Sequence, residues 1–255
     1  ADLFRVRPTG ADLEQLTDSP AYDDQAAFSP DGRQLVFVSS RAGGTADLWT
    51  LNLQTRRSKA LTSGPGGDFR PSWSPDGRWI AFSSDRGAGF PFSYGRWEPV
   101  HLVSIYVIRP DGSGLKRIGE HGNFCGSPKW STDSREVVAY CMPAQETMDY
   151  RQGTVATGST RLISIDLATG ASTDLPAGDG VRLAPAFVAP GEIGFIRKDK
   201  AGEARGGGEI VAAREGELDL EDIVERFNQM FGRIYSFLEG RLTSGVDEFM
   251  DAALE

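Results

Sequence analysis

Hydrophobic and polar residues alternate in short runs along most of the chain, and a tight polar turn precedes several of these runs. FSPDGRQLVFVSS begins at Phe28 and WSPDGRWIAFSSD begins at Trp73. Trp130 and Phe187 precede two variants of the turn, STDS and APGE, so that the four aromatic residues are 45, 57 and 57 positions apart. Alternation with a period of two predicts half-buried β-strands. Because the pattern recurs, it predicts stacked copies of one small sheet.

A second motif follows each of the first three copies. It reads ADLWTLNLQTRR from Ala46, SIYVIRPDGSGL from Ser104 and RLISIDLATGAS from Arg161, with further copies from Asp2 (DLFRVRPTGADL) and Glu209 (EIVAAREGEL). Each unit therefore predicts strand, turn, strand, loop, strand, turn, strand, which is a four-stranded antiparallel meander. One such sheet cannot bury both faces alone. We expect an all-β propeller of four-stranded antiparallel blades, with about four to five blade units visible.

The repeat F/W-S-P-D-G-x-x-I/L-x-F-x-S, followed by I/L-Y/W-x-x-x-x-x-T/D-G, resembles that of bacterial TolB-like propellers over roughly residues 1–200. The motif is specific for the fold and poorly specific for function. The resemblance implies that SPDG is a blade hairpin and that the protein belongs to a cell-envelope complex. TolB itself resembles a six-bladed propeller preceded by an N-terminal domain that is not visible here, so its activity does not carry over directly. A cation loop formed by Asp31, Asp76 and Asp133 is the alternative reading of the turns.

The predicted domains are a propeller over residues 1–214 and an acidic tail over 215–255. Within the propeller we expect three full blades and two partial ones, at about 25–68, 69–125 and 126–181, and at 1–24 and 182–214. Closing a ring normally takes four to eight blades, so the ring is incomplete unless the two partial blades complete each other. If residues 209–213 form a third strand beside the last two inner strands, the N-terminal hairpin cannot occupy that position. The other interpretation is a longer propeller, or blades shared with another subunit.

Apolar residues recur at intervals of three and four after Asp219, which predicts an amphipathic helix of about twenty residues that includes Phe227, Phe231 and Ile234. Gly240 is expected to end this helix, and a second short helix is expected from Ser244. This α-helical tail either docks on the chain's own propeller or is an arm that binds another subunit.

Charge is concentrated in the same tail. The net charge is −9, and residues 215–255 hold 11 acidic side chains against 3 arginines, whereas the rest of the chain has 25 acidic and 24 basic side chains. Neither part offers a basic stripe for phosphates, which argues against a nucleic-acid partner. No run approaches 18 apolar residues, so no membrane span is expected.

Two long loops and one linker are predicted on the face opposite the SPDG turns, and they carry unusual side chains. We expect this upper face to contact other protein subunits, because exposed aromatic residues on a rigid scaffold favour such contacts. The predicted partner-binding residues here are Phe90, Phe92, Tyr94, Trp97, His101, His121 and Tyr150. The loops packing on one another is the alternative.

Catalytic chemistry has little support in the sequence. No G-x-S-x-G elbow occurs, so no α/β-hydrolase catalytic domain is expected. A metal site of His101 and His121 with Glu98 or Asp149 is the alternative, although the two histidines are not closely spaced. We therefore expect no catalytic residue, no metal and no cofactor.

Cys125 and Cys141 are each eight residues from Asp133, the centre of a predicted hairpin. Folding the hairpin places them opposite each other, at a distance that a disulfide can span. A disulfide suits an oxidising compartment such as the bacterial periplasm. Two reduced thiols in the blade packing are the alternative.

The function that the sequence favours is a non-catalytic, periplasmic interaction propeller within a multi-subunit assembly. The alternatives are the propeller domain of an envelope hydrolase whose catalytic part lies elsewhere, and a carbohydrate or small-ligand binder.

Overall fold

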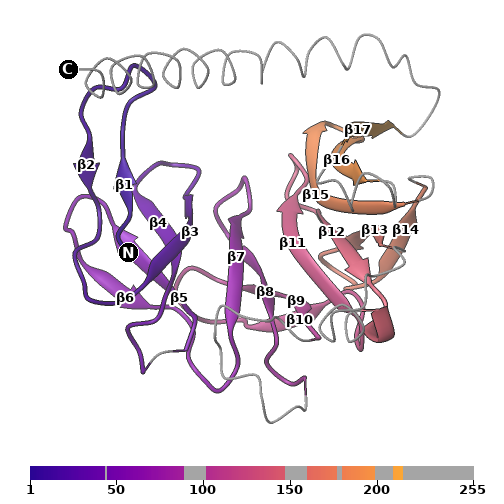
Figure 1. Ribbon diagram of the computed structural model, residues 1–255, viewed down its shortest axis with the longest axis horizontal. Helices are drawn as coiled ribbons and strands as arrows, with labels where there is room; N and C mark the ends of the chain where they lie inside the picture. The colour runs from indigo at the N-terminus through magenta and orange to yellow at the C-terminus, as the bar shows by residue number, and fades with distance from the viewer. Residues whose placement is uncertain (44, 89–101, 147–159, 177–179, 199–208, 215–255) are drawn as a thin grey trace, which may run out of the picture. The chain divides into compact units, whose positions relative to one another are not determined.

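The described part of the chain is built almost entirely of β-strands. The computed structural model describes residues 1–43, 45–88, 102–146, 160–176, 180–198 and 209–214 (Figure 1). The chain separates into two compact units, Ala1–Ala213 and Arg214–Glu255. Within the described ranges, only residues 144–146 are helical, and no helix there is long and apolar enough to cross a membrane. The predicted helical tail lies outside the described residues.

Three four-stranded antiparallel sheets follow one another along the chain, as the repeat predicts. The first contains β3 (Asp23–Phe28), β4 (Gln34–Ser39), β5 (Asp47–Asn52) and β6 (Ser58–Ala60). The second contains β7 (Asp68–Trp73), β8 (Ile80–Ser84), β9 (Ser104–Ile108) and β10 (Lys116–Ile118). The third contains β11 (Phe124–Trp130), β12 (Glu136–Met142), β13 (Arg161–Asp166) and β14 (Ser172–Leu175). In each sheet the spatial order follows the chain, which makes it a meander.

Smaller sheets lie at the two ends of the described chain. β1 (Phe4–Arg5) and β2 (Glu14–Gln15) form a two-stranded sheet, and β15 (Val181–Ala189), β16 (Glu192–Lys198) and β17 (Glu209–Arg214) form a three-stranded one. β17 occupies the third position beside β16, so within the described residues the last sheet does not pair with the N-terminal hairpin. The interpretation in which the two partial blades complete each other is therefore wrong. The blade limits drawn from the sequence stay a prediction.

The SPDG turns connect the first and second strands of their sheets. The Asp31 carboxylate accepts hydrogen bonds from the Ser29 hydroxyl at 2.6 Å and from the Arg33 amide at 3.0 Å, and these bonds lower the pKa of Asp31. Gly32 has φ +67°, a conformation that glycine adopts without steric cost. The same bonds recur around Asp76 and Asp133. Each carboxylate is thus used by its own turn, which supports the structural reading over a cation loop.

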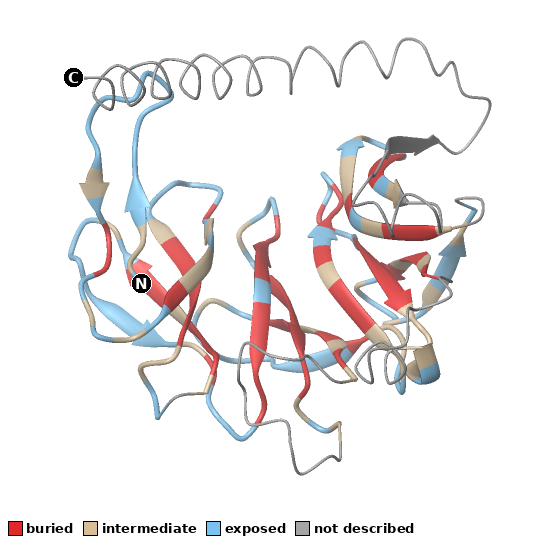
Figure 2. Cartoon of the chain, in the orientation of Figure 1, coloured by how far each residue is buried: buried red, intermediate tan, exposed pale blue. Residues whose placement is uncertain are grey.

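Hydrophobic contacts between consecutive sheets form the core (Figure 2). One buried cluster joins the first two sheets and includes Val36, Leu48, Ile80 and Phe82. A second cluster joins the second and third sheets and includes Ala81, Val107, Val137, Ala139 and Ile163. Neighbouring residues Ile80 and Ala81 enter different clusters because successive strand side chains point to opposite faces. The second sheet therefore buries both of its faces, as stacked blades require.

The repeated aromatic residue also connects consecutive sheets. The Trp73 indole nitrogen donates to the carbonyl oxygen of Ala27 at 3.2 Å, and that of Trp130 donates to Ser72 at 2.9 Å. Both tryptophans are buried, whereas Phe28, their counterpart in the first sheet, is 51% exposed. The recurring aromatic-SPDG motif thus forms a turn and, through its tryptophan, contacts the preceding sheet.

Candidate functional site

The first strands of consecutive sheets lie next to one another, and each contains one residue in the left-handed region. Gln25, Arg70, Ser127 and Ala184 have φ values of 51°, 53°, 55° and 49°. They are spaced by the repeat intervals of 45, 57 and 57, and each lies at a register shift in its strand pair. Left-handed backbone is unfavourable for residues other than glycine, and bulges of this kind redirect side chains near functional sites.

Hydrogen bonds connect these residues from one sheet to the next. The Arg70 amide donates to Gln25 Oε1 at 2.7 Å. Arg70 Nη1 donates to Ser127 Oγ at 2.8 Å and to the Tyr140 hydroxyl at 2.9 Å. We call Gln25, Arg70, Ser127 and Tyr140 the polar row. Gln25, Arg70 and Ser127 lie on the first strands β3, β7 and β11 of consecutive sheets, and Tyr140 lies on β12.

Arg70 carries an exposed positive charge in the middle of the polar row. Among the residues that the structure describes, no carboxylate lies within ion-pair distance of its guanidinium. Two of its bonds, to hydroxyl groups of Ser127 and Tyr140, hold the side chain in place without neutralising it. A guanidinium held in this way is suited to bind a carboxylate.

A small pocket of about 80 Å³ opens beside Arg70. It is lined by Gln25, Phe69, Arg70, Ser83, Val103, Phe124 and Gly126. The lining combines one charged group with two aromatic rings and a few polar atoms, and the volume is below the roughly 300–1,000 Å³ of pockets that enclose drug-sized ligands.

The first and second sheets each contain one buried ion pair, at the end of the sheet opposite its SPDG turn. Arg41 Nη2 lies 2.6 Å from Asp23 Oδ2, and Arg86 pairs with Asp68 in the same way, with both aspartates fully buried. Each arginine also donates a hydrogen bond from Nε to a serine hydroxyl oxygen, Arg41 to Ser39 of β4 and Arg86 to Ser84 of β8. We call each arrangement a clasp.

Two aromatic rings complete each clasp. The Arg41 guanidinium carbon lies 5.2 Å from the centre of the Phe37 ring and 4.9 Å from that of Trp49. In the second sheet Arg86 lies 5.6 and 5.7 Å from the rings of Phe82 and Tyr106. Cation–π contacts of this kind add to the ion pair because the arginine is largely removed from water.

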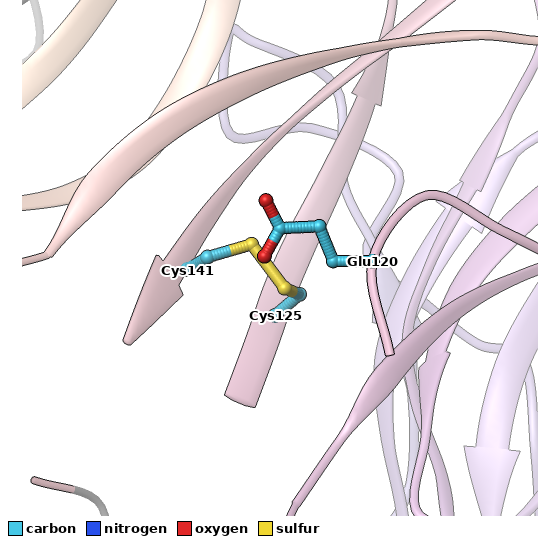
Figure 3. Close-up of side chains that lie close together, drawn as sticks. All are labelled: Glu120, Cys125 and Cys141. Carbon is cyan, nitrogen blue, oxygen red and sulfur yellow. A yellow bond between two sulfur atoms is a disulfide. The ribbon is translucent and has the colours of Figure 1, made fainter. Parts of the chain in front are cut away.

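A disulfide occupies the place of the clasp in the third sheet. Cys125 and Cys141 follow Asp68 and Ser84 by the repeat spacing of 57, and they are direct register partners. Their sulfur atoms are bonded to each other (Figure 3). Pro143 stands where the first two sheets have the arginine.

The rings of the clasp are replaced together with its charges. Ala139 and Ile163 stand at the positions that Phe82 and Tyr106 occupy in the second sheet. All members of the clasp are therefore exchanged as a set, because rings without an arginine would gain nothing from the cation–π contact, and a lone arginine would remain as a buried charge.

Glu120 lies beside this disulfide, and its carboxylate and the two sulfurs are within 4.8 Å of one another (Figure 3). The three groups do not form a metal centre, because metal binding requires thiolates and both sulfurs are in the disulfide. The Glu120 carboxylate instead pairs with Arg161 and accepts a hydrogen bond from Asn123 at 2.9 Å.

Asp85 is buried next to the second clasp. Its Oδ1 accepts a hydrogen bond from the Gly67 amide at 2.6 Å, and burial raises its pKa to about 6. A carboxyl group titrating near neutral pH is a feature of many catalytic sites. Here the group is 5% exposed and holds the loop before β7, which is a structural role.

Most partner-binding residues predicted from the sequence lie outside the described residues. These are Phe90, Phe92, Tyr94, Trp97, His101, Tyr150, Phe227, Phe231 and Ile234. His121 is described and is exposed. The histidine metal site considered as an alternative lies partly outside the described residues with His101.

Sequence reasoning missed the polar row and the clasps. The clasps had a signal, since Asp23, Ser39 and Arg41 recur 45 residues later as Asp68, Ser84 and Arg86. The polar row had a weaker one, because Gln25, Arg70 and Ser127 share a position but not a residue type.

Known proteins share this architecture. The structure of TolB from Acinetobacter baumannii aligns with this chain at a TM-score of 0.60 and 16% sequence identity. The alignment covers 84% of this chain and 46% of that TolB chain. An oligogalacturonate lyase in complex with manganese aligns at a TM-score of 0.58 and 17% identity. This alignment covers 83% of this chain and 57% of the lyase chain. At these identities the likeness is one of fold.

Sequence similarity is more specific. The chain is 46% identical to the Protein TolB homolog of Chlorobium luteolum over 113 residues, which are 44% of this chain and 23% of that relative. The chain thus spans less than a quarter of this relative. Residues 13–179 match the family described as the TolB beta propeller domain. With its three meander sheets and their repeated SPDG turns, the chain belongs to the TolB β-propeller domain family.

Proposed function

We propose that this chain is a non-catalytic interaction propeller of a bacterial envelope assembly and that the polar row binds an acidic group of a protein partner. The observation that carries the proposal is Arg70, an exposed cation beside a small pocket, held by two hydroxyl groups and facing no carboxylate among the described residues. Family membership and the TolB homologue support a protein-binding role.

The upper-face loops would extend the same interface. Trp97 and Tyr94 are the aromatic residues that we expect to anchor a partner there, since tryptophan, tyrosine and arginine dominate binding energy at protein interfaces. A periplasmic location fits the disulfide between Cys125 and Cys141, because such bonds persist in oxidising compartments.

Capture experiments with envelope extracts test the proposal. The full chain is compared with Arg70→Glu, and with Arg33→Glu as a matched control, since Arg33 is an exposed arginine on an SPDG turn. We expect cross-linked partners to be retained by the full chain and by the control, and to be lost with Arg70→Glu. Equal retention by all three proteins would exclude the polar row as the binding site.

The loops need a separate test. Replacing Trp97 and Tyr94 with Ala together should weaken capture of the same partner if the upper face takes part. Unchanged capture by this variant would limit the interface to the polar row. A hydrolase propeller domain and a carbohydrate binder remain the alternative functions, and a sugar-dependent rise in melting temperature would favour the binder.

A further inference from the structure

Three groups that can bind a metal ion meet at one end of the third sheet (Figure 3). Cys125 of β11 and Cys141 of β12 are direct register partners, and Glu120 lies in the segment between β10 and β11. A carboxylate oxygen of Glu120 and the two sulfur atoms all lie within 4.8 Å of one another. Ligand atoms around one tetrahedral zinc ion are about 3.5–3.8 Å apart, because zinc–ligand bonds are about 2.1–2.3 Å long. The three groups can therefore share one ion once the sulfurs are no longer bonded to each other.

The Glu120 carboxylate is held by two donors that use only one of its oxygens. Oε2 accepts hydrogen bonds from Asn123 Nδ2 at 2.9 Å and from the Arg161 guanidinium. Among the residues that the structure describes, no group donates to Oε1. Carboxylates that bind metal ions are themselves fixed by hydrogen bonds from neighbouring groups. Oε1 is thus the oxygen that remains available to an ion.

The third sheet contains a carboxylate and a guanidinium that the second sheet lacks at the same positions. There, 57 residues earlier in the chain, Ser63 and Ser104 stand at the positions of Glu120 and Arg161. A disulfide requires neither group, because its two sulfur atoms are uncharged and already bonded. An ion held by two thiolates would use both groups, with the carboxylate as its third ligand and the guanidinium as a balancing charge.

Charges at this end of the sheet would balance around one divalent ion. Two thiolates and the Glu120 carboxylate bring three negative charges, and the ion and the paired Arg161 bring three positive ones. Asp174, the other partner of Arg161, has a side chain that is 64% exposed to water. Cys125 and Cys141 are both buried among apolar side chains. Such surroundings disfavour a bare thiolate, so thiolates form there together with a cation.

We propose that the reduced chain binds one zinc ion through the Sγ atoms of Cys125 and Cys141 and Oε1 of Glu120, with water in the fourth position. The ion and the disulfide are alternative cross-links between β11 and β12, because the same two sulfurs form either one. This inference concerns the third sheet alone and does not depend on partner binding by the polar row.

The exchange between the two states balances in electrons and protons. A dithiol reductant transfers two electrons and two protons to the disulfide, which becomes two thiols while the reductant becomes a disulfide. Each thiol then loses its proton to solvent as its sulfur binds zinc, so two protons leave for each ion bound. A disulfide oxidant reverses both steps and releases the ion.

Cobalt(II) is the probe for the site, because it occupies tetrahedral zinc sites and its thiolate complexes absorb light strongly. The chain is reduced with a dithiol while unfolded, separated from the reductant, refolded without metal or oxygen, and titrated with Co²⁺. We expect one ion per chain, a thiolate absorption band that Zn²⁺ abolishes, and release of about two protons per ion. The oxidised chain should show no band. A refolded, reduced chain without the band would overturn the proposal.

Two glutamine substitutions test the role of Glu120. Glu120→Gln keeps the shape of the side chain, removes its charge, and should weaken Co²⁺ binding at least about tenfold. Glu136→Gln is the matched control, because Glu136 is an exposed glutamate of β12 that is not one of the three ligands. It should bind Co²⁺ as the unaltered chain does. Equal affinity in all three proteins would overturn the three-ligand site.

A second measurement covers the case in which the reduced chain folds poorly without metal. The reduced chain and the variant with both Cys125→Ala and Cys141→Ala are refolded with and without Zn²⁺, and their urea midpoints are compared. Zinc should raise the midpoint of the reduced chain, because the ion binds the folded state, and should leave the alanine variant unchanged. No rise in the reduced chain, or an equal rise in both proteins, would show that the cysteines hold no ion.

Discussion

The disulfide between Cys125 and Cys141 provides the sharpest test of the third sheet. It joins register partners on β11 and β12 that are 16 residues apart in sequence. Constraining a loop of this size in the unfolded chain is worth about 3 kcal/mol in the chain-entropy treatment. Because unfolded chains in general retain some residual structure, this value is an upper limit.

The magnitude can be read as a shift in denaturant midpoint. With a urea dependence of about 2 kcal/mol per molar, a loss of about 3 kcal/mol corresponds to about 1.5 M urea. Cys125→Ala with Cys141→Ala should lower the midpoint by up to this amount. Because both cysteines are buried, reduction of the wild-type chain requires a reductant under unfolding conditions before refolding.

Mass spectrometry and urea denaturation together make the assay. The oxidised chain should take up no alkylating label when it is unfolded without reductant, and two labels after reduction. The double alanine variant is the control, since its midpoint should not respond to reductant. Labelling of the untreated chain would refute the bond, and an unchanged midpoint after proven reduction would refute its contribution to stability.

Four further substitutions test other parts of the structure. Burial raises the pKa of Asp85 from 3.8 to about 6, so the folded chain binds the proton more tightly than the unfolded chain. The free energy of unfolding should therefore fall by at most about 3 kcal/mol as pH rises from about 4 to about 6. Urea titrations at several pH values measure this fall, and Asp85→Asn should remove the contribution of this carboxyl group. Gly66→Ala should cost about 1–3 kcal/mol or more, because its Cβ would lie 2.7 Å from the Arg86 backbone, and an unchanged melting temperature would contradict that contact. Trp130→Ala should lower the free energy of unfolding by about 3–5 kcal/mol, because Trp130 is buried. Phe28→Ala, at a position that is 51% exposed, should lower it by less than about 1 kcal/mol. Similar losses for the two variants in urea unfolding would contradict the packing described for the repeat.

The sequence predicted the strands, the turns and their repetition because these depend on local chemistry. A Pro-Asp-Gly turn needs only its own residues to form, as the bonds to Asp31 show. Alternation of apolar residues decides which side chains of a strand are buried. The opposed positions of Cys125 and Cys141 follow from the length of one hairpin, and the structure has the same register.

The polar row could not be predicted in this way, because it joins residues from different sheets. Arg70 gains its place from Gln25, 45 residues before it, and from Ser127, 57 residues after it. Their left-handed backbone at a bulge is also invisible to a pattern of period two, since a bulge adds one residue to one strand only.

The sequence by itself determined that this protein is built from repeated four-stranded sheets, because each repeat carries the turns and the alternation that form one sheet. The tertiary structure alone decided which strands lie beside each repeat within the described residues. Ala1–Arg7 and Ala46–Asn52 have closely similar patterns, yet Val6 is exposed and Leu51 is buried. The physical reason is that burial depends on the strand that pairs alongside, as β4 does with Leu51, and a segment's own residues do not encode that neighbour.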